Sequence, residues 1–167
     1  MDWAWTCRCC GKQFNTMPLD YACPVPGPWS DASDAERAAG RIDSDLCRLG
    51  EHRFIRGCLE IPIIGTEENL VFGVWTSLSQ ASFQRVVETW TDAAGEGLSY
   101  FGWFCNELPA ALYPPTHGLK CRVHLRGVTA RPRIELEPTD HPLAVEQRLG
   151  IDVARVEAIA AVLLPKH

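Results

Sequence analysis

The stretch R-F-I-R-G-C-L-E-I-P-I-I, residues 53–64, decides the fold class of this chain. It is rich in β-branched residues, and successive side chains of a strand point to opposite faces. The core-side residues are Ile55, Leu59, Ile61 and Ile63. The opposite side carries Arg56, Cys58 and Glu60. The stretch therefore predicts a long strand with one buried face and one polar face.

Similar stretches follow along the chain and predict further strands at residues 46–49, 70–77, 100–106, 120–126 and 133–137. Helices are predicted at 35–39 behind the cap Ser33, around 83–90, at 141–149, and after the cap Asp152. Consecutive strands with segregated helices predict an α+β fold, with a largely antiparallel sheet and helices packed on it.

The 167 residues fit one compact unit. Residues 1–32 are expected to form an N-terminal cysteine knuckle and a Pro-rich loop, and residues 33–167 the α+β domain. A net charge of −5 argues against nucleic acid as a partner. We expect no membrane span, since no long apolar run is present, and a cytoplasmic location, since the N-terminus lacks the pattern of a signal peptide.

The segment Cys7-Arg8-Cys9-Cys10-Gly11-Lys12 contains a C-x-x-C spacing followed by glycine. Two thiolates at this spacing can grip one tetrahedral ion, so the segment predicts a structural zinc site. Cys7 and Cys10 are the expected pair, and Cys9 is a spare thiol. Zinc needs further ligands, for which the candidates are Cys23, Cys47 and His52. Metal-free thiols and a redox-active C-x-x-C remain alternatives.

The polar side of the sheet is the second candidate site. Period-two alternation places Arg122 and His124 on one face, next to Glu135 of the following strand. If Trp103 lies on the same side as Arg56 and Glu60, this side combines aromatic surface with convergent charges, as in ligand clefts and protein interfaces. The alternative to a binding site is a solvent-exposed face whose charged residues form cross-strand ion pairs.

An enzymatic role is a further alternative, in which His124 or His141 works with a neighbouring glutamate as a general base. The acidic residues before His141 equally suit the start of a helix, where the helix dipole stabilises negative charge. The chain contains no nucleophile elbow, P-loop, H-E-x-x-H or dinucleotide motif.

Several stretches resemble, in order, a bacterial family known as domain of unknown function 2199. They are C-R-C-C-G-K, R-I-D-S-D-L-C, F-I-R-G-C-L-E-I-P-I, G-V-W-T-S-L-S, Y-F-G-W-F-C, L-K-C-R-V-H-L and I-E-L-E-P-T-D-H-P-L-A-V-E-Q-R-L-G-I. The resemblance implies a bacterial cytoplasmic protein and implies no activity. It places the family's cysteine pair on Cys7 and Cys10 and a further cysteine on Cys47. Relatives tend to have a histidine where this chain has Phe14.

Together these features predict a zinc-stabilised, non-enzymatic protein that binds a protein partner or a small ligand. The predicted binding residues are Arg56, Glu60, Trp103, His124 and Glu135, and the predicted zinc ligands are Cys7, Cys10 and Cys47.

Overall fold

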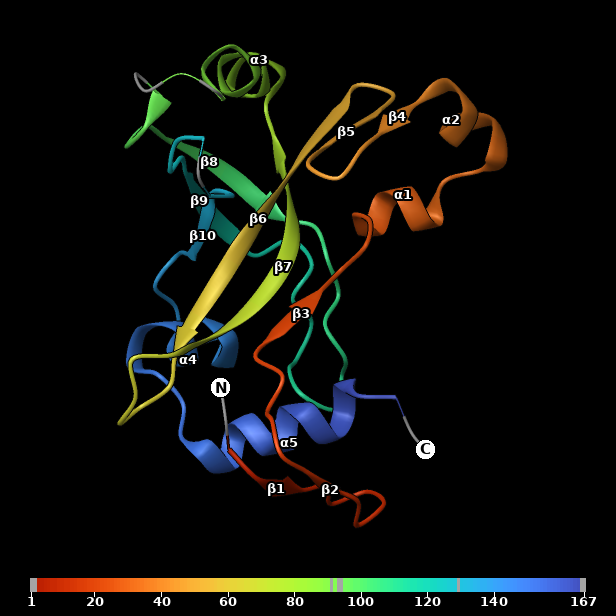
Figure 1. The fold of residues 1–167 in the computed structure, drawn as a ribbon. Helices are drawn as coiled ribbons and strands as arrows, with labels where there is room; N and C mark the ends of the chain where they lie inside the picture. Colours follow the sequence, from red (N-terminus) through yellow and green to blue (C-terminus); the bar gives the residue numbers. More distant parts are fainter. Residues whose placement is uncertain (1–2, 91, 93–94, 129, 166–167) are drawn as a thin grey trace.

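The computed structural model describes residues 3–90, 92, 95–128 and 130–165 (Figure 1). The strands are β1 (Trp5–Thr6), β2 (Gln13–Phe14), β3 (Asp20–Ala22), β4 (Arg41–Ile42), β5 (Leu46–Leu49), β6 (His52–Pro62), β7 (Asn69–Leu78), β8 (Ser99–Phe104), β9 (Lys120–His124) and β10 (Arg133–Leu136). The helices are α1 (Gly27–Asp31), α2 (Asp34–Ala39), α3 (Gln80–Thr89), α4 (Pro142–Leu149) and α5 (Val153–Leu163).

Strands β6 to β10 close into a barrel. They pair in the order β7-β8-β9-β10-β6, and β6 pairs again with β7. These pairings are antiparallel except for β10 and β6, which run parallel where Arg133 faces Cys58. Strand β3 is also parallel to its neighbour β7. The α+β class is confirmed, but the prediction of a largely antiparallel sheet is wrong, because the last strand returns to the first and the closed barrel is mixed.

The predicted elements are confirmed to within a few residues, and local chemistry explains their ends. Ser33 and Glu36 form a capping box at the start of α2. Ser79 and Asp152 accept hydrogen bonds from the first turns of α3 and α5. Gly150, with a φ of 81°, ends α4. None of the helices formed by the described residues is both long and apolar enough to cross a bilayer.

The main core fills the barrel and continues under the helices at both ends. Helix α3 lies at one end, and α4, α5 and the β1–β2 hairpin lie toward the other (Figure 1). Along the strands, fully buried side chains alternate with outward-facing ones, as period two requires, and the helices add buried side chains from one face. They include Leu59, Ile61, Val74, Val123, Ile134, Val86 and Ile159.

A second, smaller core covers the outer face of β6 and β7. The segment from α1 to β5 packs Cys47 and Leu49 against Phe54, Trp75 and Cys105. Trp75 is fully buried, and its indole Nε1 donates to the carbonyl of Cys23 at 3.1 Å. The barrel therefore has one covered outer side, over β6 and β7, and an open side, over β8, β9 and β10.

Closure of the barrel depends on a glycine. A Cβ atom on Gly57 of β6 would lie 2.6 Å from the Cδ1 atom of Ile134 and 2.9 Å from the carbonyl oxygen of Pro132. Ile134 is fully buried, so it has little freedom to move aside. Glycine at this position lets β10 approach β6.

We predict that Gly57→Ala lowers the free energy of unfolding by about 1–3 kcal/mol, the usual cost of overpacking a dense core. Gly73→Ala is the matched control on the neighbouring strand, since its Cβ would have ordinary contacts of 3.4 Å. Urea unfolding of both variants measures the difference. Equal stability of Gly57→Ala and Gly73→Ala would contradict the role of Gly57 in closure.

Candidate binding face and cysteine cluster

The first cysteines lie in the turn of the β1–β2 hairpin. Trp5 stacks on Phe14 across the hairpin, with ring centroids 4.9 Å apart, and its indole donates to the carbonyl of Thr16 at 2.9 Å. In the turn, the amide of Gly11 donates to the carbonyl of Cys7 at 2.8 Å, and Gly11 adopts a φ of 70°, which favours glycine. Phe14 thus has a packing role in the hairpin.

Three thiols converge in this turn. The sulfur atoms of Cys7, Cys9 and Cys10 all lie within 4.8 Å of one another. Cys7 is buried against the main core, whereas Cys9 and Cys10 are exposed. The Sγ atoms of Cys7 and Cys9 are 2.9 Å apart. Hydrogen bonds from the Cys9 side chain and backbone lower the pKa of Cys7 to about 7, and the same contact raises the pKa of Cys9 to about 11. Of these two thiols, Cys7 therefore ionises more readily than Cys9.

The distant zinc ligands predicted from the sequence do not join this group. Cys47 lies in β5 within the second core, at the opposite end of the molecule from the β1–β2 hairpin (Figure 1). Burial and the nearby Asp43 raise the pKa of Cys47 to about 11, which disfavours a thiolate. Cys23 packs beside the same second core, and His52 begins β6. Cys9, which the sequence pattern presents as a spare thiol, is the third cysteine of the group.

The donor set of this cluster suits a soft or borderline cation. Thiolates bind zinc with Zn–S distances of about 2.3 Å, so two sulfurs of a tetrahedral site lie about 3.8 Å apart. The three sulfur atoms of the cluster all lie within 4.8 Å of one another, close to that spacing. Among the described residues no fourth ligand joins the group. A metal held here would keep one open coordination position. The cluster also lies in a hairpin, not at the strand–helix junction typical of a redox C-x-x-C.

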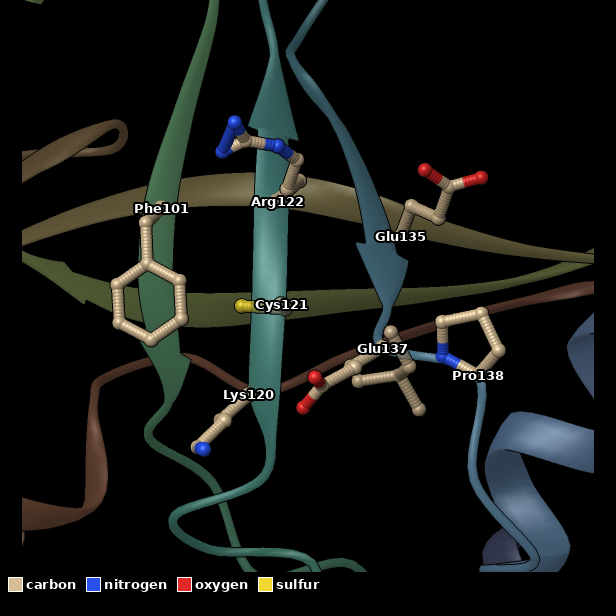
Figure 2. A pocket seen from close by; sticks show the side chains of 8 residues that line it. Phe101, Lys120, Cys121, Arg122, Glu135, Glu137 and Pro138 are labelled. Atoms are coloured by element: carbon tan, nitrogen blue, oxygen red, sulfur yellow. The ribbon is translucent and has the colours of Figure 1, made fainter.

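On the open side of the barrel, each of the strands β8, β9 and β10 presents a band of side chains to solvent. The band is aromatic on β8, basic on β9 and acidic on β10. On β8, Phe101 and Trp103 are 46% and 43% exposed, with rings edge to face at 5.2 Å. The adjacent strand β9 presents basic residues, because Arg122 pairs in register with Phe101 and Lys120 pairs with Trp103. The outer band is acidic, with Glu135 directly opposite Arg122. Figure 2 shows Phe101, Lys120, Arg122 and Glu135 on the three strands.

A hollow of about 260 Å³ lies over these bands, lined by Phe101, Lys120, Arg122, Glu135, Glu137 and Pro138 among others (Figure 2). Phe101 also lines a second hollow of about 360 Å³, which reaches Trp103, His52 and the start of α3 at Gln80. The shared ring of Phe101 joins the two hollows into one surface. We call this surface the barrel face; it comprises Phe101, Trp103, Lys120, Arg122, His124, Glu135 and Glu137.

Ion pairs fix several charged side chains at the edges of the barrel face. His124 Nε2 lies 3.0 Å from Glu135 Oε1, and Arg133 lies 3.7 Å from the other oxygen of Glu135. Glu60 accepts from Arg126 at 2.7 Å. The structure thus brings together His124 and Glu135, as the sequence analysis expects, and places Trp103 on the same outer side of the barrel.

Arg56 is separated from the other predicted binding residues. It faces Trp75 across β6 and β7, on the side that the second core covers. One guanidinium nitrogen reaches the carbonyl of Ser44 at 3.5 Å, while its buried Nε has no partner among the described residues. The strand pattern correctly places Arg56 on the outer face, but it carries no information about the segment that covers this face.

His141 is engaged at the start of α4. Its Nδ1 accepts from the amide of Leu143 at 3.1 Å, and its Nε2 lies 3.1 Å from the carbonyl of Pro115. With one nitrogen accepting, the other is the donor, so both ring nitrogens serve the fold. His141 itself therefore caps the start of α4, and none of the acidic residues before it lies in the first turn of the helix.

Sequence reasoning did not name Phe101 and Lys120, and it placed Arg122 on the polar face without including it among the binding residues. The signal was present, since Phe101 precedes Trp103 by two positions and so shares its face. Lys120 and Arg122 share the face of His124 for the same reason. The missing information was the register of β8 on β9, which sets aromatic and basic residues side by side.

Comparisons with known proteins agree with the resemblance found in the sequence. The model of a family described as an uncharacterized protein conserved in bacteria, DUF2199, matches residues 6–151. No curated protein and no solved structure matches the chain. The matched segment runs from β1 to the end of α4 and includes both the cysteine cluster and the barrel face. The chain therefore belongs to the bacterial DUF2199 family.

Proposed function

We propose that this chain is a non-enzymatic bacterial cytoplasmic protein that binds a protein partner through the barrel face and is stabilised by zinc at the cysteine turn. The observation that carries the proposal is the pair of exposed rings, Phe101 and Trp103, in register with Arg122 and Lys120. Aromatic residues and arginine are enriched at protein interfaces and supply most binding hot spots.

The chemistry of the bands favours one kind of partner surface. An apolar side chain of the partner would cover the rings of Phe101 and Trp103, and an adjacent acidic residue would meet Lys120 and Arg122. Strand β9 is paired with β8 and β10 on its two edges, and β8 is paired with β9 along Ser99–Trp103 and with β7 at Trp103 and Phe104. Recognition would depend on the side chains that these strands present.

The hydrogen bond between His124 and Glu135 favours an enzyme as the second candidate function. It offers an imidazole whose one nitrogen is held by a carboxylate, as in general-base catalysis. Its position weakens this candidate. Both side chains are partly exposed, at 28% and 48%, and the hollow over the bands is lined by Glu135 and not by His124. A binding role accounts for the exposed rings, which the enzyme alternative leaves without a purpose.

The binding proposal is tested by site-specific crosslinking. A photoreactive phenylalanine analogue at position 101 is expected to capture one bacterial protein reproducibly. The same analogue at position 64 is the control, since Ile64 is 61% exposed but lies in the turn after β6. The captured protein is then purified and titrated against wild type and Trp103→Ala. Loss of a hot-spot tryptophan costs about 2 kcal/mol or more, so we expect at least a roughly 30-fold weaker Kd.

Ile64→Ala should bind the captured protein with wild-type affinity. The proposal would be abandoned if position 101 captured nothing that position 64 did not, or if Trp103→Ala bound as tightly as wild type. A separate outcome would exclude the enzyme alternative. It would fail if His124→Ala left the biological phenotype intact while Trp103→Ala removed that phenotype.

The zinc component is tested by metal analysis of untagged protein purified without chelator. We expect about one zinc per chain in wild type and in Cys47→Ser, and none in Cys7→Ser or Cys10→Ser, because only the latter cysteines belong to the cluster. Cys7 belongs to the main core, so metal loss should also lower the melting temperature. Metal-free wild type, or loss of zinc from folded Cys47→Ser, would overturn this part of the proposal.

A further inference from the structure

Three arginines form a continuous row across β4, β5 and β6, at the edge of the sheet. Arg41 of β4 is directly opposite Arg48 of β5, and Arg48 is directly opposite Arg53 of β6. Directly opposed residues on neighbouring strands point to the same side, with Cβ atoms about 4.5–5.5 Å apart. We call Arg41, Arg48 and Arg53 the arginine row.

The arginine row carries positive charge that the described part of the fold does not neutralise. Of the ion pairs formed by residues that the structure describes, none includes Arg41, Arg48 or Arg53. Like charges directly opposite each other destabilise a sheet. The chain has 21 acidic residues against 16 basic ones, so a lack of carboxylates does not explain the row.

Two members of the row are held in place without losing their charge. The guanidinium of Arg48 lies over the ring of Phe83 in α3, 5.2 Å from its centroid. Arg53 donates to the carbonyl of Gly50 at 2.7 Å and to the carbonyl of His52 at 3.0 Å through one nitrogen. An arginine that stacks on a ring keeps its N–H edge available for an anion.

A small hollow opens beside the row. Its volume is about 210 Å³, and it is lined by Arg41, Asp43, Leu46 and Arg48. Asp43 is the only acidic residue among these lining residues, and one of its oxygens already accepts from the amides of Asp45 and Leu46 at 2.8 Å. The hollow is below the range of about 300–1,000 Å³ usual for drug-sized ligands, so it fits a small group.

We propose that the hollow between Arg41 and Arg48 binds the phosphate group of a small molecule, with Arg53 adding to the positive field. Guanidinium forks match phosphate oxygens in bidentate geometry. A dianion also offsets the repulsion between neighbouring arginines, which a monocarboxylate does less well. The hollow between Arg41 and Arg48 shares no lining residue with the barrel face or the cysteine cluster, whereas Arg53 also lines the hollow that reaches Phe101 and Trp103.

Isothermal titration of the full chain at constant ionic strength tests the site. The probes are inorganic phosphate and glycerol phosphate, with succinate as a dianion of different chemistry. Saturable binding of either phosphate in preference to succinate is expected. Tighter binding of glycerol phosphate would point to a phosphorylated small molecule as the source, and tighter binding of inorganic phosphate to the free ion. Absence of saturable phosphate binding, or preference for succinate, would overturn the proposal.

Substitutions of single arginines test whether phosphate binds at the arginine row. Arg41→Gln and Arg48→Gln are each expected to weaken phosphate binding at least tenfold. Without phosphate, Arg41→Gln is expected to have a melting temperature equal to or above that of wild type, because it removes a like-charge contact. Arg148→Gln is the matched control, since Arg148 is exposed at the end of α4 and far from β4 and β5 (Figure 1). Equal loss in the control, or unchanged binding by Arg41→Gln, would disprove the assignment.

Discussion

The parallel contact between β6 and β10 is the constraint on which the architecture depends. Where Arg133 meets Cys58, the last strand of the barrel returns to the first, and Gly57 leaves room for the buried Ile134 beside it. Without this contact, β8, β9 and β10 would continue as an open sheet. With it, their inner side chains share one core, and their outer side chains form a curved surface of fixed register.

The same closure divides the outer surface into two regions with different chemistry. Over β6 and β7, the segment from α1 to β5 supplies a second core, in which Trp75 and Cys47 are fully buried. Over β8, β9 and β10 no element of the described chain takes that position, and Trp103 remains 43% exposed. One tryptophan thus serves stability and the other is available for contact, although both lie on the outside of the barrel.

Local features were predictable from the sequence, whereas long-range ones were not. Ser33, Ser79 and Gly150 mark helix ends through contacts with near neighbours, so short motifs suffice to find them. The closed barrel depends on the pairing of Arg133 with Cys58, which lie far apart in the sequence. The alternation of side chains along a strand does not indicate which strand it will pair with. The cysteine spacing identified Cys7 and Cys10, but the direction of the Cys9 thiol depends on the turn at Gly11. The arginine row needs the register of three strands, one of which, β4, is only Arg41–Ile42 and gives no pattern of its own.

A barrel that closes on itself also limits how this protein can associate wrongly with its own copies. Free strand edges with unpaired amides and carbonyls are templates for aggregation. The outer edges of the main sheet are the short strands β3, Asp20–Ala22, and β4, Arg41–Ile42. Each offers only a few backbone groups, and each bears an exposed charge, at Asp20 and at Arg41. The longest strand, β6, has neighbours on both of its edges once the fold forms.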